Sequence, residues 1–261
     1  MIEPKLRLGG MALRNGLLVH GPTRWAAAVR AEDGSLRVAS GRKPRVRAFG
    51  RVPGVRGVIR LGEAMAVIPL VKAALPEAEL PFAGARTAAA TAGVTVAAAG
   101  LRRRGTGMAT EAAVGAMSLL PALLALHAGE LAAYHGVEHK AIAAYEQDAE
   151  DAADASKEHD RCGSHLVAPM LAANLAGTAL LRRAVERPGP LAGGAVALGS
   201  VAAAVEVFAW SERHSATRLA RVLRRPGHEL QRMLGTREPT ERQLEVGRAA
   251  LAEILRVEGA A

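Results

Sequence analysis

Four apolar runs follow one another between residues 82 and 210 of the chain. A membrane-spanning helix needs about 20 predominantly apolar residues. The second and fourth runs come close to this length, whereas the third has only sixteen residues before Arg182. The pattern predicts four spanning helices, and the alternative is a soluble alanine-rich helical bundle. The runs cover residues 82–101, 112–134, 166–181 and 191–210.

The first part of the chain has the shorter alternating pattern of β-strands. The segments WAAAVR and SLRVAS are joined by Glu32, Asp33 and Gly34, and the Asp-Gly pair is a strong hairpin signal. We therefore expect a small β hairpin region within residues 1–50. From Val52 to Leu75 the apolar residues follow helical spacing but are interrupted by charges, which favours an interfacial or docking helix over a span.

The chain from residue 211 onward is charged and is expected to form a soluble helical tail. Pro226 and Gly227 should break a helix that begins near His214, and a last helix should begin at Glu238 or Thr240 and continue through Arg256. The predicted fold is mainly α, a polytopic helical membrane protein of about four spans. Its predicted parts are residues 1–50 (β-containing), 51–80 (amphipathic helix), 81–210 (membrane region with a site-bearing 135–165 loop) and 211–261 (tail).

Composition and charge support the membrane interpretation. The apolar residues are mostly small, with only 3% aromatics, which lets helices pack closely. The net charge of +9 comes largely from arginine clusters beside the apolar runs. Nucleic acid is not an expected partner, because few aromatics are available for stacking and no binding motif occurs. The expected partners are the lipid bilayer and a substrate or protein that the sequence does not identify.

The expected location is the cell membrane, with several passes. The N-terminus has no apolar stretch typical of a cleaved signal peptide, and the single Cys162 excludes an intramolecular disulfide. Four spans would place both termini in the cytoplasm. They would also place Arg102–Arg104 outside, against the tendency of basic residues to remain inside. One span could therefore be re-entrant or miscounted.

The segment YHGVEHKAIAAYE, after the second apolar run, has the spacing of a helix-borne metal site. On a helix, His135 and His139 share a face, and Glu138 lies beside them. The same order occurs in inverzincin metalloproteases, where two histidines bind zinc and the glutamate acts as the base. The alternative is that both histidines simply reach water at the end of an apolar helix.

Further ligands could come from HDRCGSH, residues 159–165. His159, Cys162 or His165 could add an imidazole or a thiolate, and a Cys/His set suits zinc better than magnesium. Alternatively, Cys162 is a small buried residue beside a helix N-cap at Ser164. Glu206, late in the fourth run, is a further candidate ligand, because carboxylates inside membranes are often functional; the alternative is an edge residue reaching water.

Together these motifs resemble the domain of unknown function 1385 (DUF1385) family of bacterial proteins, which are described as predicted metal-dependent membrane proteins. The blocks that carry the resemblance occur in family order: GGMALRNGLLVHGP, PGVRGVIRLGEAM, YHGVEHKAIAAYE, RCGSH and PGHELQRMLGTREPTERQLEV. The chain departs from the family pattern at Met11, Asn15, His165 and Gly235. At Asn15 the family has a glutamate, so the first block cannot supply an acid here. Any site implied by the resemblance is therefore centred on the YHGVEHK and RCGSH blocks.

The residues and the resemblance lead to one functional hypothesis. We expect a metal-dependent membrane enzyme, a hydrolase, that binds a divalent metal, with zinc favoured. His135 and His139 are the expected ligands, Cys162 or Glu206 completes the set, and Glu138 is the general base. The alternative is a non-catalytic membrane scaffold or assembly factor that uses the His/Glu cluster structurally.

Overall fold

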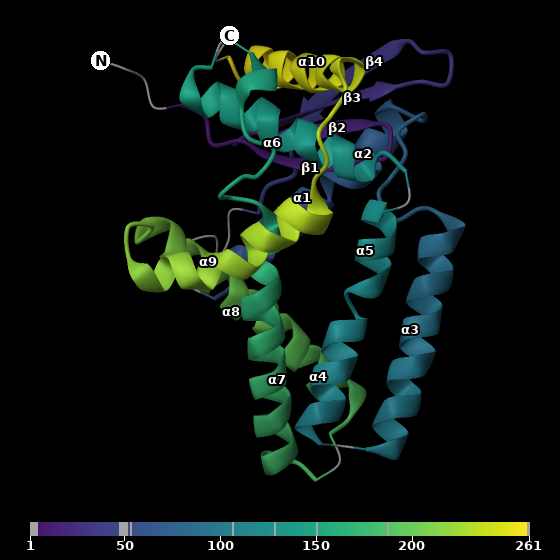
Figure 1. Ribbon diagram of the computed structural model, residues 1–261, viewed down its shortest axis with the longest axis vertical. Helices are drawn as coiled ribbons and strands as arrows, with labels where there is room; N and C mark the ends of the chain where they lie inside the picture. The colour runs from purple at the N-terminus through teal and green to yellow at the C-terminus, as the bar shows by residue number, and fades with distance from the viewer. Residues whose placement is uncertain are drawn as a thin grey trace.

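The computed structural model describes residues 5–46, 52, 54–105, 107–127, 129–149, 151–186 and 188–259. A β-sheet with its covering helices forms a cap at one end, and long helices extend from it (Figure 1). The described chain is therefore mainly helical, as the sequence predicts.

The cap contains an antiparallel sheet of four strands in the order β1-β2-β3-β4. The predicted hairpin is confirmed as β3 and β4, and Gly34 in its turn has a φ of +80°. The sheet is larger than the predicted hairpin, because β1 and β2 extend it through a second tight turn before Gly16. The strands are β1 Gly9–Leu13, β2 Gly16–His20, β3 Arg24–Arg30 and β4 Leu36–Arg42.

Alternating residues of the sheet supply two separate cores. Leu17, Val19, Ala26 and Ala28 face helices α6 (Leu131–Gln147) and α10 (Glu241–Glu258). Leu18, Trp25, Ala27 and Val29 face the opposite core, which α2 (Val67–Ala74) completes. This period of two is what a strand buried on both faces requires.

The predicted amphipathic segment forms two helices, α1 (Arg56–Met65) and α2, with Ala66 between them. Helix α2 docks on the sheet through Val67 and Val71. Helix α1 instead packs on α8 (Pro190–Arg213), where a Cβ added at Gly57 would lie 2.3 Å from Val205 Cγ1. The docking prediction is therefore confirmed for α2.

Among the described residues, three helical segments are long and apolar enough to cross a membrane: Met108–His127, Gly163–Ala184 and Pro190–Arg213. The first consists of α4 (Met108–Met117) and α5 (Leu120–His127), and the second contains α7 (Val167–Ala184). The predicted span over residues 82–101 is not among them, because the alanine, threonine and glycine of α3 (Ala85–Arg104) contribute little hydropathy. The predicted span 112–134 also extends too far, since residues 131–134 begin the separate helix α6.

The C-terminal region contributes to the cap and to its junction with the long helices. Helix α9 (Arg218–Leu230) begins after Thr217, whose hydroxyl accepts a hydrogen bond from the Ala220 N–H. The predicted break at Pro226 and Gly227 is wrong, because both lie inside α9. A π-helix, η3 (Gln231–Gly235), follows directly, and α10 begins with a capping box formed by Thr240 and Gln243.

Candidate metal centre

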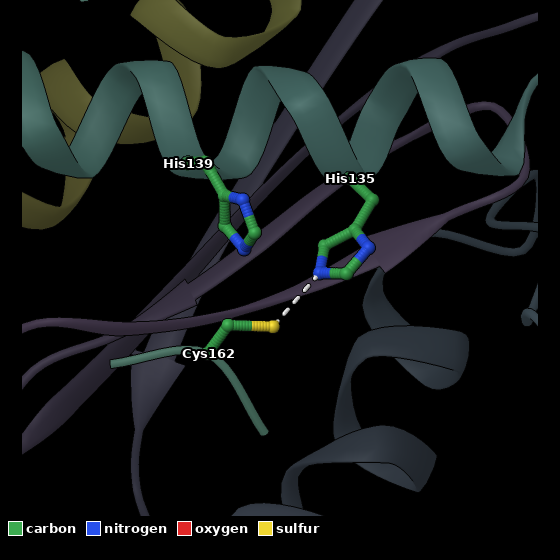
Figure 2. Close-up of side chains that lie close together, drawn as sticks. All are labelled: His135, His139 and Cys162. Atoms are coloured by element: carbon green, nitrogen blue, oxygen red, sulfur yellow. Dashed lines mark hydrogen bonds between the residues drawn. The ribbon is translucent and has the colours of Figure 1, made fainter. Parts of the chain in front are cut away.

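Three potential ligand atoms converge where the cap meets the long helices. His135 and His139 project from the same side of α6, and Cys162 approaches from the start of η2 (Gly163–Leu166) (Figure 2). One ligand atom from each residue lies within 4.8 Å of the other two. The predicted helical pairing of the histidines and the proposed third ligand Cys162 are therefore brought together.

Backbone carbonyls hold both imidazole rings by the same nitrogen. His135 Nδ1 lies 2.8 Å from the Gly235 oxygen, and His139 Nδ1 lies 2.5 Å from the Lys157 oxygen. A carbonyl oxygen only accepts, so each Nδ1 must donate, and in the neutral ring this leaves Nε2 with its lone pair free. This is the usual support for a metal-binding histidine.

The Nε2 atoms of the two histidines have different surroundings. His135 Nε2 lies 3.3 Å from Cys162 Sγ. His139 is 1% exposed, and its Nε2 is buried without a hydrogen-bond partner among the described residues. A buried polar atom without a partner costs about 1–3 kcal/mol, so a ligand from outside the described residues would stabilise this atom.

Burial and neighbouring groups shift the pKa values of the two histidines in opposite directions. Burial, together with the positive charge of His135, lowers the pKa of His139 to about 2. Burial alone would also lower the pKa of His135, but the hydrogen bond to Cys162 and the charge of Glu138 raise it to about 9. His139 is therefore neutral at neutral pH, the form that binds a metal, whereas His135 must release a proton to do so.

Glu138 lies beside this cluster on the side of the sheet. The Ala12 backbone N–H donates to its carboxylate. A Cβ on Gly10 would lie 2.6 Å from Glu138 Cγ, so only glycine leaves room for the side chain. Burial raises the pKa of Glu138, and the charges of His135 and His159 oppose that rise. Glu138 is not one of the three converging residues.

Residues 128–257 match the model of a family described as Protein of unknown function (DUF1385). The chain belongs to this family. The matched region of DUF1385 includes both histidines, Cys162 and the π-helix that holds His135. No curated protein and no solved structure matches the chain.

Gln231, which the sequence did not single out, holds the segment carrying Cys162. It is 0% exposed, and its Oε1 accepts from the His159 N–H at 2.8 Å. Its Nε2 lies within hydrogen-bonding distance of the His159 oxygen, Ser164 Oγ and His165 Nε2. Gln231 begins the only π-helix among the described residues, and π-helices occur frequently at functional sites. Its partners lie far away in the sequence, so no local pattern singles it out.

Cys162 also has the local role predicted for Ser164. The Cys162 sulfur, not the Ser164 side chain, caps η2, because the Ser164 N–H donates to it at 3.5 Å. Cys162 is buried as well. Cys162 is therefore both a small buried residue that caps η2 and a candidate metal ligand.

Glu206 lies elsewhere and does not join the cluster. Its carboxylate accepts from the Arg56 guanidinium at 2.5 and 2.9 Å and from the Gly54 N–H at 2.9 Å. These bonds connect α8 with the start of α1. The structure therefore gives Glu206 a structural partner in place of the predicted ligand role.

The remaining predicted residues surround the cluster or stabilise the cap. The His159 ring centre lies 5.7 Å from that of His139, and its Nε2 lies 3.2 Å from Glu146 Oε2. His165 Nδ1 contacts the Arg224 oxygen, so this imidazole is also used structurally. Lys140 is buried and donates to the oxygens of Ala153 and Ala155, and Arg161 pairs with Glu146.

Asn15 has a role that a glutamate could not fill in the same way. Its Nδ2 donates to the oxygens of Arg30 and Glu77, each at 3.0 Å, and its Oδ1 accepts from the Glu79 N–H at 2.9 Å. An ionised carboxylate only accepts hydrogen bonds. Asn15 thus fastens the β1–β2 turn to the chain after α2.

A pocket of about 440 Å³ opens beside His159. Its lining carries both acidic and basic side chains, including Glu158, Arg161 and Arg224. His159 belongs to this lining, and its ring also lies near that of His139 in a tilted arrangement. The pocket therefore adjoins the cluster on the side of η2.

Proposed function

We propose that the chain is a membrane-associated metal-dependent hydrolase whose metal, zinc, is held by His135, His139 and Cys162. The observation that carries this proposal is the buried His139 Nε2, which has no partner among the described residues and converges with His135 and Cys162.

The spacing of the three atoms fits an ion of the size of zinc. With Zn–N near 2.0–2.1 Å and Zn–S near 2.3 Å, tetrahedral ligand atoms are roughly 3.4–3.6 Å apart. The Nε2 of His135 and the sulfur of Cys162 are already 3.3 Å apart, and the whole set lies within 4.8 Å. Shifts of roughly 1 Å would close the set around the ion. A thiolate with two imidazoles also favours zinc over magnesium or calcium.

Three protein ligands leave a fourth position open, which is typical of a catalytic rather than a structural zinc site. A zinc ion bound there supplies a Lewis acid and lowers the pKa of water to about 7. The carbonyls of Gly235 and Lys157 keep the two imidazoles oriented. We assign Glu138 as general base, because it follows His135 by three positions on α6 and lies beside the cluster, and because burial raises the pKa of its carboxyl group.

The pocket beside His159 supports a substrate site on the same side. Arg161 and Arg224 in its lining would attract a negatively charged group, although each already pairs with an acidic residue. His159 lies between this pocket and His139. A substrate in the pocket would thus approach the centre across His159.

The three candidate spans support an integral membrane protein with the centre at the membrane surface. The segment Gly163–Ala184 begins one residue after Cys162, so a bilayer around α7 would end close to the cluster. Helix α3 runs alongside α4 and α5 (Figure 1) and would serve as a fourth pass. Four passes would place both termini on the same side of the cell membrane, the cytoplasmic side.

A structural metal in a membrane scaffold is the second candidate. It is favoured by the three separate segments that meet at the cluster, namely α6, the 157–165 segment and η3. A metal there would fasten these segments together. Under this alternative Glu138 has no chemical role.

Metal analysis of the purified protein tests the centre. We expect near-stoichiometric zinc that is lost in the double variant His135→Ala/His139→Ala. Cys162 is the single cysteine, so a sulfur-to-cobalt charge-transfer band in the cobalt-loaded protein can come only from its thiolate. We expect this band in the wild type and its loss in Cys162→Ser.

His228→Ala is the matched control, because His228 is exposed and lies outside the cluster. It should retain both the metal and the band. Wild-type protein without metal, or a cobalt complex without a thiolate band, would contradict the proposed centre.

A further inference from the structure

Helix α9 presents two opposite surfaces. On the inner side, Ala220 and Gly227 are buried, and a Cβ added at Gly227 would lie 2.5 Å from His165 Nδ1. Arg224 on this side pairs with Asp160 at 2.9 Å. This inner side is therefore packed against the segment that carries Cys162.

The outer side of α9 combines exposed arginines with exposed apolar side chains. Arg218, Arg221 and Arg225 lie three and four residues apart and so form one line along the helix. Their guanidinium groups make no ion pair within the part of the chain that the structure describes. Beside this line, Leu219 is 57% exposed and Val222 is 65% exposed. A shallow groove of about 380 Å³ is lined by the three arginines and Val222.

The position of α9 places this outer surface at one end of the candidate spans. The helix begins a few residues after the segment Pro190–Arg213 ends, and it packs against α8, η2 and the cap end of α7. In Figure 1, α9 lies crosswise to α7, near the cap. A bilayer around α7 and α8 would therefore have its surface at the level of α9.

We propose that the outer side of α9 lies in the membrane interface and binds the phosphate groups of anionic phospholipids. This inference rests on the membrane association proposed above. Leu219 and Val222 enter the boundary of the acyl chains, as the apolar residues of an interfacial helix do. The three arginines form no ion pair in the described part of the chain, although the charge of Arg225 also acts on Glu229, and they bind the phosphates by paired hydrogen bonds.

The charge of this surface selects one kind of lipid. A basic residue near an anionic membrane surface contributes about 1 kcal/mol of binding energy, which is roughly a fivefold change in affinity. Three arginines acting together should therefore give at least about a tenfold preference for anionic over zwitterionic lipid. An acidic protein partner would form ion pairs with the arginines, but such a partner would not explain the exposed apolar side chains of Leu219 and Val222 beside them.

Lipid titration of the full-length protein in detergent micelles tests the proposal. Trp210, near the end of α8, stacks on His214 and reports on this region once Trp25 is changed to phenylalanine. In that background we expect phosphatidylglycerol with brominated chains to quench Trp210 at about tenfold lower concentration than brominated phosphatidylcholine. The triple variant Arg218→Gln/Arg221→Gln/Arg225→Gln should lose this preference.

The matched control is Arg37→Gln/Arg42→Gln/Arg242→Gln, which removes the same charge from exposed positions on β4 and α10. It should keep the preference. No preference in the wild type, a preference that survives in the α9 variant, or an equal loss in the control would each overturn the inference.

The same preparations separate this inference from the proposed function. Wild-type protein released from membranes by carbonate washing would contradict the membrane association itself. Firm retention in the membrane without lipid selectivity would overturn only the role of α9. The cobalt band of Cys162 should persist in both triple variants and shows that their metal centre is intact.

Discussion

His135 Nδ1 donates a hydrogen bond to the carbonyl oxygen of Gly235, one hundred residues later in the chain, at 2.8 Å. Gly235 is the last residue of the π-helix η3, and Gln231 is its first. The same short element therefore fixes one imidazole of the centre through Gly235 and the Cys162 segment through Gln231. A region predicted as a separate tail is part of the support of the candidate centre.

We predict that Gln231→Leu weakens zinc binding by about 10–100-fold, which is the usual effect of losing a residue that orients metal ligands. Leucine keeps much of the volume but cannot bond to His159, Ser164 or His165. The segment carrying Cys162 then loses its fixed position. Competition with a chromogenic chelator measures the affinity.

Gln243→Leu provides the control for this experiment. Gln243 is also buried, but it belongs to the capping box of α10. Its loss should lower thermal stability and leave zinc affinity unchanged. If both variants lose affinity equally, Gln231 acts through stability alone.

We predict that Gly136→Ala destabilises the protein by about 1–3 kcal/mol, as overpacking does. A Cβ at Gly136 would lie 2.4 Å from the Arg237 carbonyl oxygen, which belongs to the backbone and cannot rotate away. The Arg237 N–H also bonds to the Ala132 oxygen, so the chain crosses α6 in close contact. Denaturant unfolding in detergent measures the change.

The comparison for Gly136 is Gly163→Ala, in the RCGSH block. A Cβ at Gly163 would meet nothing within 4 Å. This variant should unfold within about 0.5 kcal/mol of the wild type, as is usual for surface changes. Equal stability of both variants would show that the crossing chain can move away from α6.

The sequence predicted the part of the site that depends on local spacing. His135 and His139 are four residues apart on one helix, so helical geometry alone places them together. Cys162 could be proposed from its residue type, but its position depends on how the 157–165 segment folds. His159 and Ser164 of this segment form hydrogen bonds with Gln231, which lies 72 and 67 residues later in the chain. No local pattern reveals these contacts.

The same distinction explains where the structure departs from the sequence-based expectations. Helix α3 is long enough to be a span, but its alanine and threonine residues do not decide between lipid and protein surroundings. Glu206 was proposed as a ligand because it lies in an apolar run, and its partner Arg56 is 150 residues away. Asn15 followed by Gly16 is a further hairpin signal, and it marks the β1–β2 turn.

We predict that His20 makes the metal-free protein less stable as pH falls from about 6.5 to 4. Burial, together with the charge of Lys43, lowers the pKa of His20 to about 4. The unfolded state therefore binds a proton near pH 6.5 that the folded state takes up only near pH 4. The contribution of His20 to the free energy of unfolding is fully present above pH 6.5. It is lost as pH falls, by up to about 3 kcal/mol at pH 4 and below.

Thermal unfolding in detergent and chelator, at several pH values, measures this effect. In His20→Gln the amide oxygen can still accept a hydrogen bond from Lys43, but the side chain does not titrate. The difference in stability between pH 7 and pH 4 should be smaller in the variant than in the wild type. Identical pH profiles would show that His20 keeps its ordinary pKa in the folded protein.

We predict that Glu138→Gln retains the fold and the metal but abolishes function in cells. Glutamine has nearly the same shape, fits against Gly10 and still accepts the hydrogen bond from the Ala12 N–H. It cannot accept a proton from the attacking water, which is the role of a general base. Complementation of a strain that lacks the protein gives the functional readout, and zinc content and protein level are measured in parallel.

Glu130→Gln, at an exposed position just before α6, is the control and should complement fully. Full complementation by Glu138→Gln would contradict the hydrolase assignment, whereas loss of zinc together with function would make Glu138 a support of the centre and favour the scaffold.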